Sequence, residues 1–125
     1  MSGVTRALKP RMLKQVPLTL IRSNGGQWVG GRWQPALDTQ VLIEASIQPV
    51  TRSTDLMMLP EGDRAKAAVE VWSASEIRMV REGNGGWSPD RFTWLGDEYE
   101  VMKAMSWQMG HIDHYHAVCK RVETV

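Results

Sequence analysis

The sequence predicts a mainly β protein: a small antiparallel β-barrel or sandwich of six to seven strands, with one short helix and an extended N-terminal arm. Two observations lead to this fold class. Several short segments alternate apolar and polar residues with the period of two that is typical of strands. Glycine- and proline-containing turns separate these segments, with no long helix between them. Strands in such an order pair with their neighbours and close into a sandwich or a barrel.

The size and composition fit one domain with one core. The chain has 125 residues, of which 42% are hydrophobic and 23% are charged, as in soluble globular proteins. We expect no membrane span and no signal peptide, because the apolar runs are too short. The single cysteine, Cys119, cannot form an internal disulfide and suits a reducing cytoplasm. A formal net charge of +1 does not indicate nucleic-acid binding.

Residues 1–16 form a basic arm that we place outside the barrel domain of residues 17–125. The arm contains no acidic residue and lacks amphipathic periodicity. Its basic side chains are Arg6, Lys9, Arg11 and Lys14. Two interpretations stay open: a disordered terminus, or an arm that becomes ordered against a partner.

The first half of the domain contains two strand-like runs around a turn-rich stretch. The run "PLTLIR" begins at Pro17, and "SNGGQWVGGRWQP" then reads as a hairpin or broad loop that carries tryptophans. In "TQVLIEASIQPV", the apolar residues Val41, Ile43, Ala45 and Ile47 alternate with their neighbours. This is the clearest strand of the chain, and Pro49 ends it.

Residues 51–66 interrupt the alternation. Ser53 or Thr54 is a suitable N-cap for a short helix over residues 55–59, which Pro60 would stop. The following "PEGDRAK" is polar and turn-forming. This excursion is either a helix packed on a barrel end or a segment used in assembly.

Alternation resumes in "AAVEVWSASEIRMV", and a glycine-rich loop, "REGNGGWSPD", follows it. The remainder reads as a β-meander, with "RFTWL", "EYEVMKAMSW" and "DHYHAVCKRV" as its strands. A tight hairpin turn is expected at residues 95–97. Tyr99, Val101 and Lys103 are expected to share one face of their strand.

The three histidines of the chain lie within "HIDHYH", at His111, His114 and His116. On a strand, His114 and His116 point the same way, but two imidazoles do not complete a zinc site. There is no second cysteine and no HExxH motif, and Asp113 is expected on the opposite face. We therefore expect no metal site. The two histidines are expected to face solvent or an interface, and replacing all three is expected to leave the fold unchanged.

Other catalytic patterns are missing from the sequence. It has no GxSxG motif, and its glycine pairs are not followed by the GK[ST] of a phosphate loop. Cys119 lies in the middle of a strand, where a small side chain is usually buried. Six tryptophans leave a single-stranded nucleic-acid-binding, OB-like barrel as an alternative, and a metal-dependent enzyme as a weaker one.

Three passages resemble a known family. They are "IEASIQPVTRSTDLMMLPEGDR", "VEVWSASEIR" and "DRFTWLGDEYEVMKAMSWQMGHIDHYHAVCKRV". Their order and spacing resemble the small head–tail joining proteins of tailed bacteriophages, also called head-closure, neck or connector proteins. The resemblance spans roughly residues 18–122, and the terminal "G..YEV.....W......HY.AV" pattern is its most persuasive part.

The resemblance implies a structural role in the virion, and neither an enzymatic activity nor a cofactor. Such proteins are small β-barrels or sandwiches that assemble as a ring, of six copies by preference or of twelve. The ring lies between the portal-bound connector and a tail terminator or tail tube protein, and packaged double-stranded DNA passes through its lumen without sequence-specific binding. The protein would be made in the bacterial host cytoplasm.

Interfaces with other subunits or layers are expected at three places. The first is the basic arm. The second is the excursion, with Asp55, Leu56, Met57, Met58, Leu59, Glu61, Asp63 and Arg64. The third is the pair of glycine-rich loops, with Trp28, Trp33 and Trp87. Tryptophan and arginine are favoured anchors of protein interfaces.

Overall fold

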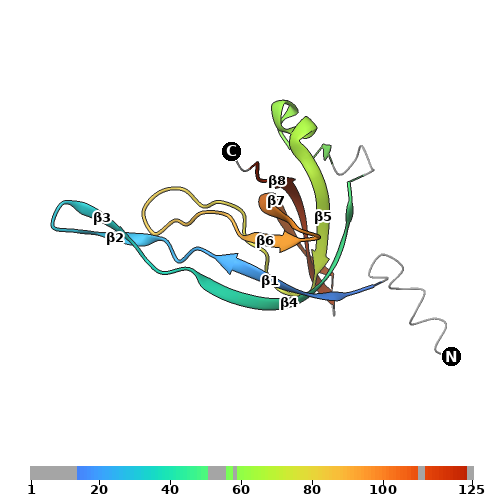
Figure 1. The fold of residues 1–125 in the computed structure, drawn as a ribbon, viewed down its shortest axis with the longest axis horizontal. Coiled ribbons are helices and arrows are strands. Elements are labelled where there is room, and N and C mark those ends of the chain that lie inside the picture. The colour runs from blue at the N-terminus through green and yellow to red at the C-terminus, as the bar shows by residue number, and fades with distance from the viewer. Residues whose placement is uncertain (1–13, 51–55, 58, 110–111, 124–125) are drawn as a thin grey trace.

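Six antiparallel strands close into a barrel in the computed structural model of the chain (Figure 1). The structure describes residues 14–50, 56–57, 59–109 and 112–123. The barrel strands follow the order β1-β4-β5-β8-β7-β6, and β2 and β3 form a separate two-stranded sheet. The elements are β1 (Val16–Arg22), β2 (Gly26–Val29), β3 (Arg32–Pro35), β4 (Thr39–Pro49), the 3-10 helix η2 (Glu61–Lys66), β5 (Ala67–Ser73), β6 (Arg91–Trp94), β7 (Asp97–Met109) and β8 (Ile112–Arg121).

The core lies inside the barrel and confirms most of the predicted alternation. Ile43 and Ala45 of β4 are buried, whereas Leu42 and Glu44 are exposed. The buried core cluster comprises Leu18, Leu20, Ile43, Ala45, Val69, Val71, Ile77, Phe92, Tyr99, Val101, Ala117 and Cys119. Each strand of the barrel contributes to this cluster through every second residue, as the pleat requires. The fold class that the alternation predicted is therefore confirmed.

The barrel is unevenly closed. Strand β1 pairs with β4 along its whole length, from Val16↔Ala45 to Arg22↔Thr39. Its other edge pairs with β6 only at Ile21↔Arg91. Because one backbone pairing holds little of a sheet together, the contact between β1 and β6 depends on the side chains around it.

A bulge in β7 changes which side chains face the core. The pairing of β7 with β8 shifts register between Val101 and Lys103, so that Met102 is the extra residue. Beyond a bulge the side chains exchange faces. Ala104 accordingly packs against the core, and the prediction that Lys103 shares the face of Tyr99 and Val101 is wrong.

The tight turns follow the glycines of the sequence. Leu95 and Gly96 connect β6 to β7 with φ values of 51° and 86°, between the paired residues Trp94 and Asp97. Two consecutive residues with positive φ make a turn whose twist matches that of a hairpin. The predicted turn at residues 95–97 is confirmed.

A short helix follows Pro60. The 3-10 helix η2 begins at Glu61, immediately after Pro60, in the segment that the sequence suggested to be a turn. Proline is well suited to the start of a helix because its missing N–H would have no partner there. Of the helix predicted over residues 55–59, Leu56 is helical and Met57 lies in a turn, while residues 55 and 58 lie outside the described part.

The thiol of Cys119 is fully buried on β8. Burial, and next the negative charge of Asp90, raise the pKa of this thiol. The folded chain therefore keeps the proton that an unfolded chain loses above the usual thiol pKa of about 8.5. Stability from this group is complete below that pH and decreases as the pH rises above it. A buried, protonated thiol is a poor nucleophile.

Candidate interaction surface

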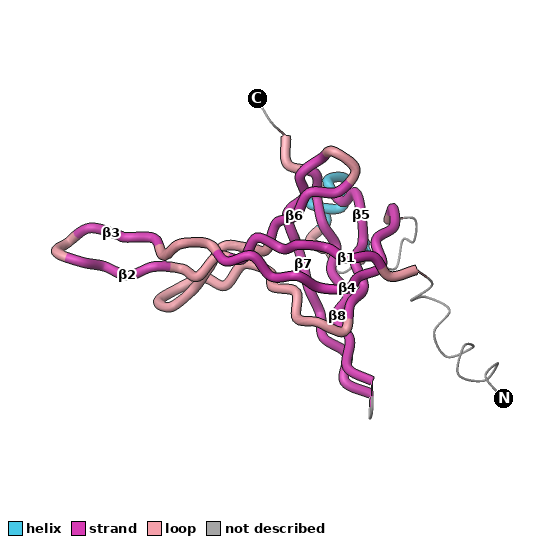
Figure 2. The backbone as a smooth tube through the Cα atoms, turned by 60° about the horizontal axis from the view of Figure 1, so that its bottom comes forward, coloured by secondary structure: helices cyan, strands magenta, loops and turns pink. Residues whose placement is uncertain are grey.

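The β2–β3 hairpin projects from the barrel, as Figure 2 shows, beyond the end of the β1–β4 ribbon. Apart from Gly26, every residue of the two strands is exposed. Gly30 and Gly31 form the turn, with φ values of 58° and 80°. An isolated hairpin of this size is only marginally stable in water, so its conformation depends on how its base is held.

The hairpin has two chemically different faces. Trp28 pairs directly with Trp33, and Gly26 with Pro35, so these four residues lie on one face. Gln27 pairs with Gln34 on the other face. The indoles of Trp28 and Trp33 remain 67% and 47% exposed. We call the face of Trp28 and Trp33 the aromatic face.

The indoles of the aromatic face are held in place although they are exposed. The ring centroids of Trp28 and Trp33 are 5.7 Å apart with an interplanar angle of 65°, a favourable edge-to-face arrangement. A Cβ atom at Gly26 would lie 2.8 Å from the ring of Trp33. Glycine at this position therefore lets the Trp33 ring lie against the strand. A pre-arranged aromatic pair loses little entropy on binding.

The base of the hairpin is fastened on both sides. The Ala36 amide donates a hydrogen bond to the Gly25 carbonyl at 2.9 Å. The Asn24 side-chain amide donates to the Leu37 carbonyl at 2.7 Å and also to the Thr39 hydroxyl. These bonds join the segment that follows β1 to the segment that leads into β4.

Residues 81–88 form a loop that supports the hairpin base. A Cβ atom at Gly25 would lie 2.4 Å from the Gly86 carbonyl oxygen, so the two backbones are in direct contact. An isolated bridge between Arg81 and Trp87 closes the loop, with backbone hydrogen bonds of 3.0 and 2.8 Å. The loop therefore fixes the position of the hairpin base relative to the barrel.

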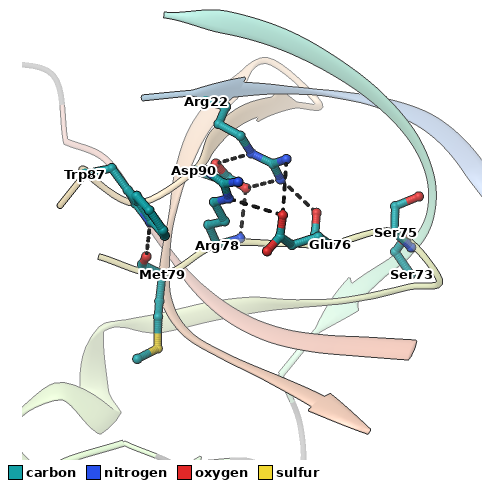
Figure 3. Close-up of polar contacts among 8 residues, drawn as sticks. All are labelled: Arg22, Ser73, Ser75, Glu76, Arg78, Met79, Trp87 and Asp90. Atoms are coloured by element: carbon teal, nitrogen blue, oxygen red, sulfur yellow. Dashed lines mark hydrogen bonds and ion pairs between the residues drawn. The ribbon is translucent and has the colours of Figure 1, made fainter. Parts of the chain in front are cut away.

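Trp87 fastens this loop instead of projecting from it. Its indole Nε1 donates a hydrogen bond to the Met79 carbonyl at 3.1 Å, as Figure 3 shows. The Cζ atoms of Arg78 and Arg81 lie 4.4 and 5.1 Å from the centroid of its ring, within reach of a cation–π attraction. Trp87 is half-buried, whereas Trp28 and Trp33 are exposed.

A buried ion pair anchors the segment that leads into the loop. Asp90 is fully buried and receives two hydrogen bonds from the Arg22 guanidinium, from Nε at 3.2 Å and from Nη2 at 2.9 Å (Figure 3). The Arg78 backbone amide donates to the same carboxylate at 2.9 Å. The hydrogen bond to Asp90 is the main cause of the raised pKa of Arg22. A bidentate pair of this kind fixes both orientation and distance.

The ion pair holds β1 where the backbone pairing does not. Arg22 ends β1, and its guanidinium also donates to the Glu76 carbonyl at 2.8 Å. Asp90 immediately precedes β6, and its carbonyl accepts a hydrogen bond from the Val101 amide at 3.0 Å. The ion pair and the backbone of Asp90 thus connect β1, the 74–90 segment and β7 at the weakly paired seam.

A shallow groove lies between the hairpin base and the 81–88 loop. Its volume is about 550 Å³, and Trp33 contributes to its wall. Polar and apolar side chains are mixed along it, including the Asp38–Arg91 ion pair at 3.2 Å. The groove therefore continues the aromatic face towards the barrel.

His116 lies in a polar cluster on β8. Its Nε2 is 3.2 Å from a Glu70 carboxylate oxygen, and its ring stacks on Trp72 with centroids 3.7 Å apart. Gln48 donates to the other Glu70 oxygen at 3.0 Å. The His116 residue is 3% exposed, so the expectation of a solvent-facing pair is wrong for His116. Its replacement by alanine is no longer expected to leave the fold unchanged.

Among residues 14–50, 56–57, 59–109 and 112–123, no group of three or more His, Cys, Asp or Glu side chains is arranged to hold a metal ion. His111 lies outside the described residues. In the part of the chain with a described structure, no helix is long and apolar enough to span a bilayer.

The other predicted interface residues are spread over the surface or fall outside the description. Arg6, Lys9, Arg11, Asp55 and Met58 lie outside the described residues. Lys14 is exposed, and β1 begins at Val16, within the range assigned to the arm. In the excursion, Met57 is 66% exposed but Leu59 is only 3% exposed. Glu61 is exposed, while Leu56, Asp63 and Arg64 are half-buried.

Sequence reasoning did not identify the residues that hold the hairpin. Arg22 and Asp90 are 68 positions apart, so no local pattern connects them. A signal was present at Gly25 and Gly86, since paired glycines are common where backbones approach closely. The sequence matches no protein-family model, and a search of curated proteins finds no match.

Replacing Gly86 with alanine is expected to loosen the hairpin. The added Cβ would lie 2.1 Å from the Arg81 carbonyl oxygen within the same loop, so the Arg81–Trp87 bridge has to open and the Gly86 backbone, which contacts Gly25, has to shift. We expect a loss of about 1–3 kcal/mol of unfolding free energy and faster hydrogen exchange of the Ala36 amide. Gly62→Ala is the matched control, because a Cβ at Gly62 meets open space. Unchanged protection of the Ala36 amide from hydrogen exchange in the Gly86 variant would show that the 81–88 loop does not hold the hairpin base.

Proposed function

We propose that this protein is a structural component of the neck of a tailed bacteriophage. In this role it forms a ring between the portal-bound connector and the tail, helps to close the DNA-filled head and provides the surface on which the tail docks. The observation that carries the proposal is the aromatic hairpin, held at its base and projecting from a small closed barrel. The protein has no enzymatic role and no cofactor in this proposal.

The architecture supports assembly. A ring repeats one heterologous contact, so two different surfaces of each subunit have to be complementary. The hairpin supplies a convex surface with two exposed indoles, and the barrel wall supplies flat strands. Exposed tryptophans near the centre of a contact contribute much of its binding energy.

The resemblance in sequence supports the same role. Its most persuasive part, "G..YEV.....W......HY.AV", corresponds to β7 and β8, which pair along ten residues of each strand. This long hairpin and β5 form the wall of the barrel opposite β1. The resembling segments thus include the framework of the fold as well as its surface.

The partners follow from the proposed position. Other copies of the chain lie beside it in the ring, with six favoured and twelve as the second possibility. The portal-bound connector lies on one side, and a tail terminator or tail tube protein on the other. Packaged double-stranded DNA passes through the lumen, where tight contacts to bases would oppose its movement. The site of function is the virion, and synthesis takes place in the host cytoplasm.

The nucleic-acid-binding alternative makes a different use of the hairpin. Stacking of single-stranded bases needs aromatic rings together with positive charge, and Arg32 is the only charged residue within residues 26–35. A titration of the purified chain with oligonucleotides at low salt separates the two functions. Salt-sensitive micromolar binding favours the alternative, and no binding favours the neck.

Deletion of the gene from the phage that encodes the protein tests the proposal. We expect filled heads and complete tails that fail to join, because the ring between them is missing. Addition of the purified chain to this lysate is expected to restore joined, infectious particles. Normal particles without the protein would contradict the proposed role, as would a defect in head filling or tail formation alone.

A further inference from the structure

The outer surface of β4 presents a second group of exposed side chains. Leu42 is 71% exposed, and Glu44, two residues further along the strand, is exposed on the same face. Exposed Pro17 and Thr19 of β1 lie opposite Glu44 and Leu42. The surface therefore combines the apolar side chains of Leu42 and Pro17 with the Glu44 carboxylate.

The backbone of β4 is also open along this part of the strand. Pairing with β5 begins only at Ala45↔Ser73, whereas β1 pairs with β4 from Thr39 onward. Within the described residues, the edge of β4 from Thr39 to Ile43 that faces away from β1 thus has no partner strand, and beyond it the Glu44 carbonyl accepts a hydrogen bond from the Ser73 hydroxyl at 2.6 Å. An open edge is a place where a strand from another chain can be added.

The hairpin carries the complementary groups. Both β2 and β3 have an open outer edge, since each pairs only with the other among the described strands. Arg32 pairs with the exposed Val29 next to the turn, so these two side chains share the face opposite the aromatic face. Neither the Arg32 guanidinium nor the Glu44 carboxylate has an ion pair within the described part of the chain. A positive charge beside Val29 thus matches a negative charge beside Leu42.

We propose that the β2–β3 hairpin of one copy docks on the outer face and open edge of β4 in a second copy, with Arg32 facing Glu44. The hairpin continues the β1–β4 ribbon away from the barrel (Figures 1 and 2), so it cannot fold back onto its own β4. The two surfaces are different, and their contact can therefore repeat from copy to copy. The contact itself does not depend on the proposed function; only its identification as the contact that forms the ring rests on that function.

A pairwise charge exchange tests the contact in the purified full-length chain. Arg32→Glu or Glu44→Arg alone is expected to weaken self-association at least about tenfold, because two like charges then meet. The double variant Arg32→Glu/Glu44→Arg restores the opposite charges, and we expect its association to return to within about threefold of the original. Sedimentation at a series of concentrations measures these changes.

Cysteine cross-linking identifies the contact directly. A mixture of Arg32→Cys and Glu44→Cys chains at high concentration is expected to form a disulfide-linked dimer, since the two Cβ atoms then come within bonding range. Asp97→Cys is the matched control: Asp97 is also exposed near an exposed leucine, Leu95, but at a convex turn. The dimer yield should be at least about tenfold lower with this control.

Each outcome decides the inference. Equal cross-linking with Asp97→Cys, no cross-linking with Glu44→Cys, or a double charge variant no better than the single ones overturns it. Failure of the proposed function is distinguishable. Chains that cross-link as expected but are absent from virions retain this contact and lose the neck role. Chains found in the neck without the 32–44 cross-link retain the role and lose this contact.

Discussion

Replacing Asp90 with alanine is expected to lower the free energy of unfolding by about 3–5 kcal/mol. The Arg22 side chain is only 12% exposed, and without Asp90 its guanidinium keeps one hydrogen bond, to the Glu76 carbonyl, and a longer ion pair of 3.7 Å with the more exposed Glu76 carboxylate. The Arg78 amide also loses its acceptor. Urea denaturation followed by tryptophan fluorescence measures the loss.

Two controls separate the ion pair from the general cost of losing a carboxylate. Asp97→Ala removes an exposed carboxylate and is expected to change stability by less than about 0.5 kcal/mol. The double variant Arg22→Leu/Asp90→Leu removes both charges together, so its loss should be smaller than that of Asp90→Ala. A loss below about 1 kcal/mol for Asp90→Ala would show that the seam between β1 and β6 does not depend on this pair.

Replacing Trp28 or Trp33 with alanine is expected to remove the protein from the particle without unfolding it. The rings of both residues are exposed and held in one arrangement, so they stabilise a contact more than they stabilise the isolated chain. Central tryptophans of interfaces contribute at least about 2 kcal/mol each, which corresponds to a loss of about thirtyfold in affinity. Quantitative immunoblotting of purified particles from a complemented deletion strain measures incorporation.

Two uncharged polar side chains of the same hairpin provide the control. Gln27→Ala and Gln34→Ala remove neither an aromatic ring nor the charge of Arg32, which lies on the same face as these glutamines, and should leave incorporation within about threefold of the original. The melting temperatures of all four variants are expected to stay close to that of the unaltered chain. Equal incorporation of the tryptophan and glutamine variants would show that the aromatic face is not an assembly surface.

The barrel strands could be predicted from the sequence because the patterns that indicate them involve only neighbouring residues. The alternation around Ile43 and the turn at Leu95–Gly96 follow from side-chain period and backbone conformation. Trp28 and Trp33 could also be predicted as exposed, since glycines surround them and no alternating run includes them. These features need only the neighbouring residues to be recognised.

Other features depend on contacts between distant segments. The Arg22–Asp90 pair and the Gly25–Gly86 approach form only once the barrel has closed. The bulge at Met102 reverses the alternation of β7 without a glycine or proline to indicate it. His116 looked like a surface residue because a polar side chain on a strand usually faces water, but Glu70 and Trp72 bury it.

An averaged electron-microscopy reconstruction of the particle, viewed along the tail axis, is the most direct test of the neck role. The account predicts a closed ring of this barrel between the portal-bound connector and the tail, with each hairpin in contact with a neighbouring subunit. Particles in which the neck contains no copy of the chain, or in which the chain occurs as isolated copies elsewhere, would contradict it.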